Sequence, residues 1–237
     1  MLTLTFAHGN IGHLFGITGG KPQVKADAVT LKSYFMPKQI QKYYAGVPVA
    51  DIKYHLDGRM LSAAELLAAD ALNNNQLKIT YNNGCTVYIN ANKNKEYALE
   101  VKGRKITLPP YGYYLNMPDK CETYSILNNS VRADYSLGDE YCYVNGNGQE
   151  NDFGAVKCRN AYAILFEDKG KTLVVIPAPF VKAEKITVDL SCLPLKQATA
   201  IIGLDENRKE VFRRELPQEC KKLELNIDGK VFSYMII

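Results

Sequence analysis

Short stretches of alternating apolar and polar residues fill the chain from residue 76 onward. Leu77, Ile79 and Tyr81 fall at every second position, which is the period of a β-strand with one buried face. An Asn-Asn-Gly turn follows at 82–84, and Asn-Gly is a strong signal for a tight hairpin. More stretches of this kind follow, separated by turn residues. The pattern limits this region to an antiparallel meander, and it predicts a β-sandwich over residues 76–160.

The last part of the chain repeats this pattern as a separate unit. Seven short strands in fewer than 80 residues are typical of an immunoglobulin-like sandwich, which we expect over residues 161–237. The chain has no Trp, so the Cys…Trp…Cys hallmark of that fold is missing and the prediction rests on strand number and alternation. The expected strands cover 161–167, 172–177, 185–190, 198–204, 209–213, 221–227 and 231–237.

Residues 1–75 follow a different pattern, which predicts a short α/β segment. Alternation over Leu2–Phe6 predicts a strand. A helix is expected over Leu31–Ala45, with Pro37 in its first turns or at a kink. A second helix is expected over Ala63–Leu72, because Ser62 begins an S-x-x-E capping box. The predicted fold class is therefore mainly β: two β-sandwich units, the second immunoglobulin-like, preceded by a short α/β segment.

The predicted opening strand has no partner in its own segment. An isolated strand cannot bury both faces or pair its backbone, so it must join the β region or belong to a larger sheet. A strand, a glycine-bearing loop and a helix together form one unit of a parallel α/β barrel. The order expected along the chain is thus the end of a barrel followed by sandwiches.

Several segments carry a resemblance to a known family. The chain is similar to the C-terminal region of large bacterial glycoside hydrolases and their relatives, in which a (β/α)8 catalytic barrel precedes one or two β-sandwiches. The resemblance extends to about residue 160. The segments that carry it read FAHGNIGHLFG, KSYFMPKQIQKYYAG, YNNGCTVYINAN, ITLPPYGYYLNM and RADYSLGDEYCYVNGNG.

This resemblance implies a non-catalytic accessory region that supports a catalytic barrel or positions polysaccharide. It also implies an extracellular or periplasmic location, although the chain shows no signal-peptide pattern. The partners it implies are a carbohydrate and the missing barrel, or a second copy that associates through the N-terminal segment. Two alternatives stay open: a free-standing carbohydrate-binding or adhesion module, and a small glycoside hydrolase.

Composition weakens the case for other classes of protein. The formal net charge is +4, but Lys and Arg are scattered among acidic residues, so no nucleic-acid partner is predicted. No apolar run approaches the roughly 20 residues of a membrane helix, and no cofactor motif is present. Because no Cys-x-x-Cys pair occurs, we expect buried free thiols rather than a disulfide framework or a zinc site. The six cysteines are Cys85, Cys121, Cys142, Cys158, Cys192 and Cys220.

Two histidines near the N-terminus are candidates for catalysis. His8 and His13 stand between glycines at the end of the predicted opening strand, where barrels place their catalytic residues. Asp27 is the third catalytic candidate, and Asp27 or His55 would complete a metal site. A spacing of five residues is not a recognised ligand spacing, so no metal site is predicted. The sequence does not identify any two carboxylates in residues 1–75 as the acid and base that glycoside hydrolysis needs.

Tyrosines are candidates for sugar contact, since the chain has 16 of them. Aromatic rings stack on the apolar faces of sugars, and the tyrosine hydroxyl adds a hydrogen bond. The alternative is that these tyrosines are strand residues packed in the interior. The carbohydrate-binding candidates are Tyr111, Tyr113, Tyr114, Tyr141 and Tyr143.

Overall fold

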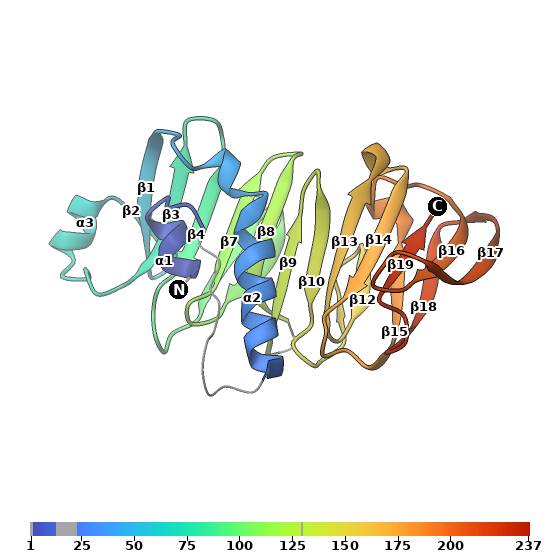
Figure 1. Ribbon diagram of the computed structural model, residues 1–237. Coiled ribbons are helices and arrows are strands. Elements are labelled where there is room, and N and C mark those ends of the chain that lie inside the picture. The colour runs from blue at the N-terminus through green and yellow to red at the C-terminus, as the bar shows by residue number, and fades with distance from the viewer. Residues whose placement is uncertain (1, 13–22, 129) are drawn as a thin grey trace.

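A computed structural model describes residues 2–12, 23–128 and 130–237 and shows a mainly β protein with a short N-terminal helical segment (Figure 1). The predicted fold class is thereby confirmed. Most strands join one long antiparallel sheet in the order β17-β16-β19-β14-β13-β10-β9-β8-β7-β4-β3-β1-β2, and β5 and β6 are attached through β8. Its strands are β1 (Val49–Leu56), β2 (Arg59–Leu61), β3 (Gln76–Tyr81), β4 (Thr86–Asn90), β5 (Tyr97–Val101), β6 (Arg104–Leu108), β7 (Tyr113–Met117), β8 (Cys121–Asn128), β9 (Val131–Leu137), β10 (Tyr141–Asn145), β13 (Ala161–Glu167), β14 (Thr172–Pro177), β16 (Ala198–Leu204), β17 (Glu210–Cys220) and β19 (Ser233–Ile236).

A smaller sheet packs behind the C-terminal half of the long sheet (Figure 1). Its order is β11-β12-β15-β18. Val156, Ile186 and Leu225 of this sheet share one buried core with Cys142 and Ile164 of the long sheet, so the two sheets form a sandwich. The strands are β11 (Asn151–Asp152), β12 (Val156–Cys158), β15 (Ala183–Asp189) and β18 (Lys222–Asp228).

The strands expected after residue 160 are present as β13 to β19. Their ends are shifted by at most two residues, except that β17 runs to Cys220 and not to the expected end at Arg213. Five of them extend the long sheet, and β15 and β18 join the smaller one. The long sheet continues across residue 160, where we expected a boundary, because β10 pairs with β13 from Tyr141↔Leu165 to Asn145↔Ala161. The smaller sheet likewise takes strands from both sides of that position.

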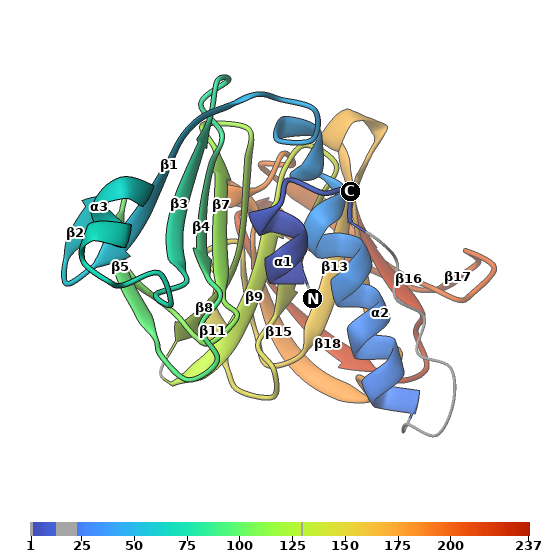
Figure 2. The same ribbon diagram turned by 90° about the vertical axis from the view of Figure 1, so that its left-hand side faces the viewer.

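The N-terminal segment is helical and covers one face of the long sheet (Figure 2). It contains α1 (Leu2–Ala7), α2 (Gln23–Lys38) and a 3-10 turn at Gln41–Tyr43. The predicted strand at Leu2–Phe6 is therefore wrong. The same residues also satisfy a helical period, because Thr3 and Phe6 are both buried. A helix pairs its own backbone groups, whereas a lone strand leaves them unpaired.

The two predicted helices exist, but their bounds differ from those expected. The first begins at Gln23 and holds Pro37 near its C-terminal end. The second, α3 (Ala63–Ala68), begins at the predicted capping box: the Ser62 hydroxyl accepts from the Glu65 amide, and the Glu65 carboxylate accepts from the Ser62 amide. It ends earlier than expected because Asp70 adopts a positive φ of 50°, which a continuing helix does not permit.

A row of four tyrosines crosses the sheet on the side away from α1 and α2. Tyr88, Tyr114, Tyr124 and Tyr135 stand directly opposite one another on β4, β7, β8 and β9. Tyr124 is stacked between its neighbours, with ring centroids at 6.0 Å and 4.9 Å. The row ends on Phe153, which stacks on Tyr135 at 6.0 Å. Cross-strand aromatic pairs of this kind stabilise a sheet beyond the area they bury.

We predict that Tyr124→Ala lowers the free energy of unfolding by about 3 kcal/mol, since it opens a cavity and removes two ring contacts. Urea denaturation measures the change. Phe232→Ala is the control because this ring is 55% exposed, and it should change stability by less than about 0.5 kcal/mol. Equal effects of the two variants would contradict this account of the row.

All six cysteines are free thiols, as predicted, and the expected burial holds for four of them. Cys192 is exposed and Cys220 is half-buried. Burial raises the pKa of the Cys85 and Cys121 thiols to about 12, so they are protonated and unreactive near neutral pH.

We therefore predict that a thiol reagent at pH 8 modifies Cys192 and then Cys220 in the folded protein, and the other four only after unfolding. Mass mapping of the labelled peptides identifies the sites. Rapid labelling of Cys85 or Cys142 in the folded chain would contradict the described burial.

Candidate functional site

A buried row of polar residues lies on the face of the sheet that α2 covers. Tyr113, Ser125, Asp134 and Asn145 stand opposite one another on β7, β8, β9 and β10, and all four are buried. Because side chains alternate along each strand, these four residues point to the other face of the sheet from the tyrosine row. The two faces of the sheet are therefore built differently: aromatic on one side, polar beneath the helix on the other.

The Asp134 carboxylate connects α2 to this row. It is fully buried and accepts hydrogen bonds from Lys32 Nζ on α2 at 2.6 Å and from Ser125 Oγ at 2.6 Å. Asn147 Nδ2 donates to its other oxygen at 3.3 Å. A carboxylate without water is stable only when it is paired and hydrogen-bonded. These contacts supply that pairing and fix the position of α2 over β8 and β9.

Gln39 provides a second buried attachment just after the end of α2. Its Nε2 donates to Ser136 Oγ at 3.2 Å and to the Tyr141 carbonyl at 3.0 Å. Gly138 leaves the space for this side chain, because a Cβ there would lie 2.4 Å from Gln39 Oε1. Phe35 adds a stack on the Tyr143 ring at 5.2 Å. Buried polar contacts of this kind fix one relative position of two elements.

Two ion pairs at the rim add smaller contributions. Lys38 contacts Glu140 at 3.0 Å and Lys42 contacts Asp139 at 2.7 Å. The hydrogen bond from Lys42 lowers the pKa of Asp139, and the one to Glu140 raises the pKa of Lys38. Each pair is largely exposed, so each contributes at most about 1 kcal/mol.

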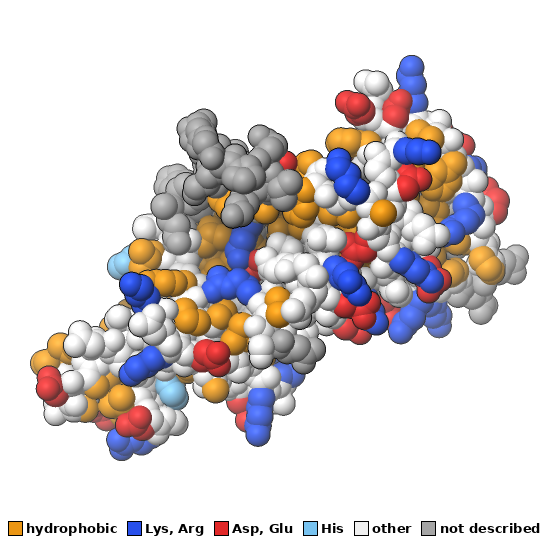
Figure 3. Space-filling model, turned by 90° about the horizontal axis from the view of Figure 1, so that it is seen from below, with side chains coloured by type: hydrophobic (Ala, Val, Ile, Leu, Met, Phe, Trp, Pro, Cys, Tyr) orange, Lys and Arg blue, Asp and Glu red, His pale blue; other side chains and the backbone are white. Residues whose placement is uncertain are grey.

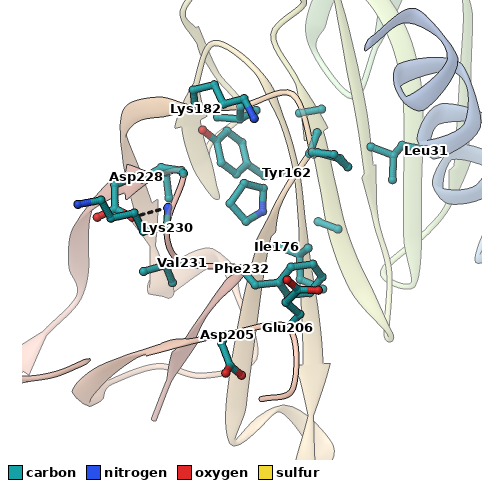
Figure 4. Close-up of a pocket in the computed structure, with 18 of the residues that line it drawn as sticks. Leu31, Tyr162, Ile176, Lys182, Asp205, Glu206, Asp228, Lys230, Val231 and Phe232 are labelled. Carbon is teal, nitrogen blue, oxygen red and sulfur yellow. Dashed lines mark hydrogen bonds between the residues drawn. The ribbon is translucent and has the colours of Figure 1, made fainter. Parts of the chain in front are cut away.

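An apolar groove with a volume of about 640 Å³ lies between α2 and the C-terminal strands (Figure 4). Its lining combines Leu31 and Phe35 of the helix with Ala163 and Ile176 of the sheet. Charged residues stand at its edges: Lys182 at one end and Asp205 and Glu206 at the other in Figure 4. Seen from below, apolar side chains gather across the middle of the molecule with charged side chains around them (Figure 3).

A smaller pocket, about 200 Å³, lies between α1, α2 and the 109–113 segment. We call it the small polar pocket, because Lys32, Arg132, Tyr111 and the hydroxyl-bearing Thr3 belong to its lining. The Arg132 guanidinium donates to the Pro110 carbonyl. The other lining residues are Leu2, Val29, Ser33 and Tyr113.

Of the three predicted catalytic residues, His8 and Asp27 lie in the described part of the chain, and neither lines the two pockets described above. His8 is exposed in the turn after α1, and Asp27 is partly buried on α2. His13 lies outside the described residues. Within the described part of the chain, no three His, Cys, Asp or Glu residues are placed to hold a metal ion.

Four of the five predicted sugar-contact tyrosines are buried in the protein, so their rings do not form the exposed surface expected for stacking on sugar. Tyr113 packs on Phe6 at 4.7 Å, and Tyr114 belongs to the tyrosine row. The Tyr141 hydroxyl donates to the Phe35 carbonyl, and Tyr143 stacks on the same residue. Tyr111 differs, because 44% of it is exposed.

Sequence reasoning missed Lys32, Gln39, Arg132 and Asp134. A signal for Asp134 existed, since Asp134 and Ser136 form the polar side of an alternating strand. Alternation alone assigns that side to solvent. It does not reveal that a helix more than 90 residues earlier in the chain covers it.

Comparisons with family models, with curated proteins and with solved structures found no match to this chain. Among the described residues, no helix has the length and apolar character needed to cross a membrane.

We predict that Lys32→Met lowers the free energy of unfolding by about 3 kcal/mol, because it leaves the Asp134 carboxylate buried without its cation. Lys42→Met is the matched control: it removes the same type of cation from an exposed pair and should cost less than about 1 kcal/mol. Chemical denaturation of both variants provides the comparison. Equal costs would show that the buried pair does not anchor α2.

Proposed function

We propose that this chain is a non-catalytic accessory region of a glycoside-hydrolase-like protein and braces a catalytic barrel. The observation that carries the proposal is the anchoring of the N-terminal helical segment to the sheet. Phe6, Met36 and Ile40 of this segment are fully buried. Asp134 and Gln39 add buried polar contacts between the segment and the sheet. A domain joined through such a segment is held in one orientation, which a flexible linker does not achieve.

Exposed apolar side chains on the same segment support the proposal. Leu4 on α1 is 52% exposed, Ile11 is 60% exposed and Tyr34 on α2 is 43% exposed. We call these three residues the helix patch. These exposed side chains are available for packing against a partner that meets the N-terminal segment. Because the chain resembles regions that follow a catalytic barrel, we propose a barrel as the partner.

The first test is the behaviour of the chain without a barrel. We predict concentration-dependent self-association through the helix patch, measured by sedimentation velocity, and its loss in Leu4→Glu/Tyr34→Glu. The control is Leu67→Glu, because Leu67 is 62% exposed on α3 and should leave association unchanged. A wild-type chain that stays monomeric at high concentration would contradict the role of the patch.

The second test is hydrolysis. The proposal predicts that the chain alone does not cleave glycosides, as measured with chromogenic substrates. Cleavage that is lost in His8→Ala, His13→Ala or Asp27→Ala would overturn it in favour of the small-hydrolase alternative.

A further inference from the structure

The small polar pocket carries more positive than negative charge. The Lys32 ammonium has three protons to donate and directs one at Asp134. The Arg132 guanidinium has five N–H donors, and the Pro110 carbonyl takes one of them. Lys32 and Arg132, together with the neighbouring Asp134 carboxylate, give a net charge of +1. A pocket with two cations and spare donors favours an anionic ligand.

An unpaired hydroxyl lies at the wall of this pocket. Tyr113 lines it, yet its buried hydroxyl has no hydrogen-bond partner among the residues that the structure describes. Burial raises the pKa of Tyr113 well above its usual value, so the group is a neutral donor. A buried polar group without a partner is unfavourable, because it has lost its hydrogen bonds to water. An acceptor oxygen bound beside it would supply the missing partner.

Tyr111 holds an exposed aromatic ring beside these donors. Its backbone has a positive φ of 59°, a conformation that is uncommon for a residue with a side chain. The turn is fixed from two sides. Thr3 Oγ1 on α1 donates to the Tyr111 carbonyl at 2.5 Å, and Gly112 packs so tightly that a Cβ would lie 2.6 Å from Pro109 Cδ. These contacts fix the backbone of Tyr111 and hold its exposed ring beside the two cations.

We propose that the small polar pocket binds an acidic sugar unit, a hexose that carries a carboxylate or a sulfate ester. Lys32 and Arg132 bind the anionic group, and the Tyr113 hydroxyl donates to one of its oxygens. The Tyr111 ring packs on the apolar face of the sugar. A volume of about 200 Å³ fits a single unit at the end of a chain or on a branch. This site does not depend on the bracing role, and it gives the carbohydrate-binding alternative a definite place in the structure.

Binding is tested by NMR titration of the wild-type chain with four probes. These are methyl glucuronide, glucose 6-sulfate, methyl glucoside and inorganic sulfate. We expect one or both acidic sugars to bind at least tenfold more tightly than methyl glucoside and than inorganic sulfate, and the stronger of the two identifies the anion. Equal binding of the neutral glucoside would overturn the role of the cations. Equal binding of inorganic sulfate would overturn the role of the sugar, and no binding up to tens of millimolar would overturn the site.

Variants assign the contacts. Arg132→Met should weaken binding of the preferred acidic sugar at least tenfold. Tyr111→Gly removes the ring, tolerates the positive φ and should weaken it several-fold. Tyr113→Phe should also weaken it several-fold, whereas Tyr143→Phe removes another unpaired buried hydroxyl and should leave it unchanged. Unchanged affinity in Arg132→Met, with the fold intact by circular dichroism, would overturn the proposal. Leu4→Ser/Tyr34→Ser removes two apolar side chains of the helix patch without adding charge and should bind normally, so a failure of the bracing role is distinguishable from a failure of this site.

Discussion

The buried ion pair between Lys32 and Asp134 is the constraint on which the arrangement of this protein depends. Asp134 has no exposure to water, so it is stable only with its cation and hydrogen-bond donors in place. Those partners come from α2, from β8 and from the loop at Asn147. A displaced helix would leave a carboxylate buried and unpaired. The N-terminal segment is therefore part of the folded body and not an appendage.

The two faces of the long sheet stabilise the fold in different ways. The aromatic face, with Tyr114, Tyr124 and Tyr135 in contact, stabilises the sheet through ring stacking and burial. The polar face beneath the helix fixes the position of α2. Both pockets open beside α2, because a single helix cannot cover a sheet of this width. Candidate binding residues lie there for the same reason, at the margins of the helix.

Much of the β-structure could be predicted from the sequence because it depends on local patterns. Alternation located the strands after residue 160 to within two residues, apart from the C-terminal end of β17, and the Ser62 capping box located the start of α3. Which strands join which of the two sheets could not be predicted, since pairings such as β12 with β15 join distant segments. The error at Leu2–Phe6 has the same origin: five residues satisfy a strand period and a helical period alike, and only the absence of a pairing partner decides between them. Arg132 and Asp134 were missed because the polar pattern of β9 is also that of a solvated strand face.

The central claim is that α2 and the long sheet form one cooperative unit, and native-state hydrogen exchange tests it most directly. The account predicts that the most protected amides of α2 exchange only through global unfolding, with the same opening free energy and the same denaturant dependence as the amides of β8 and β9. Exchange of the whole of α2 through a local opening, several kcal/mol below that of the sheet, would contradict it.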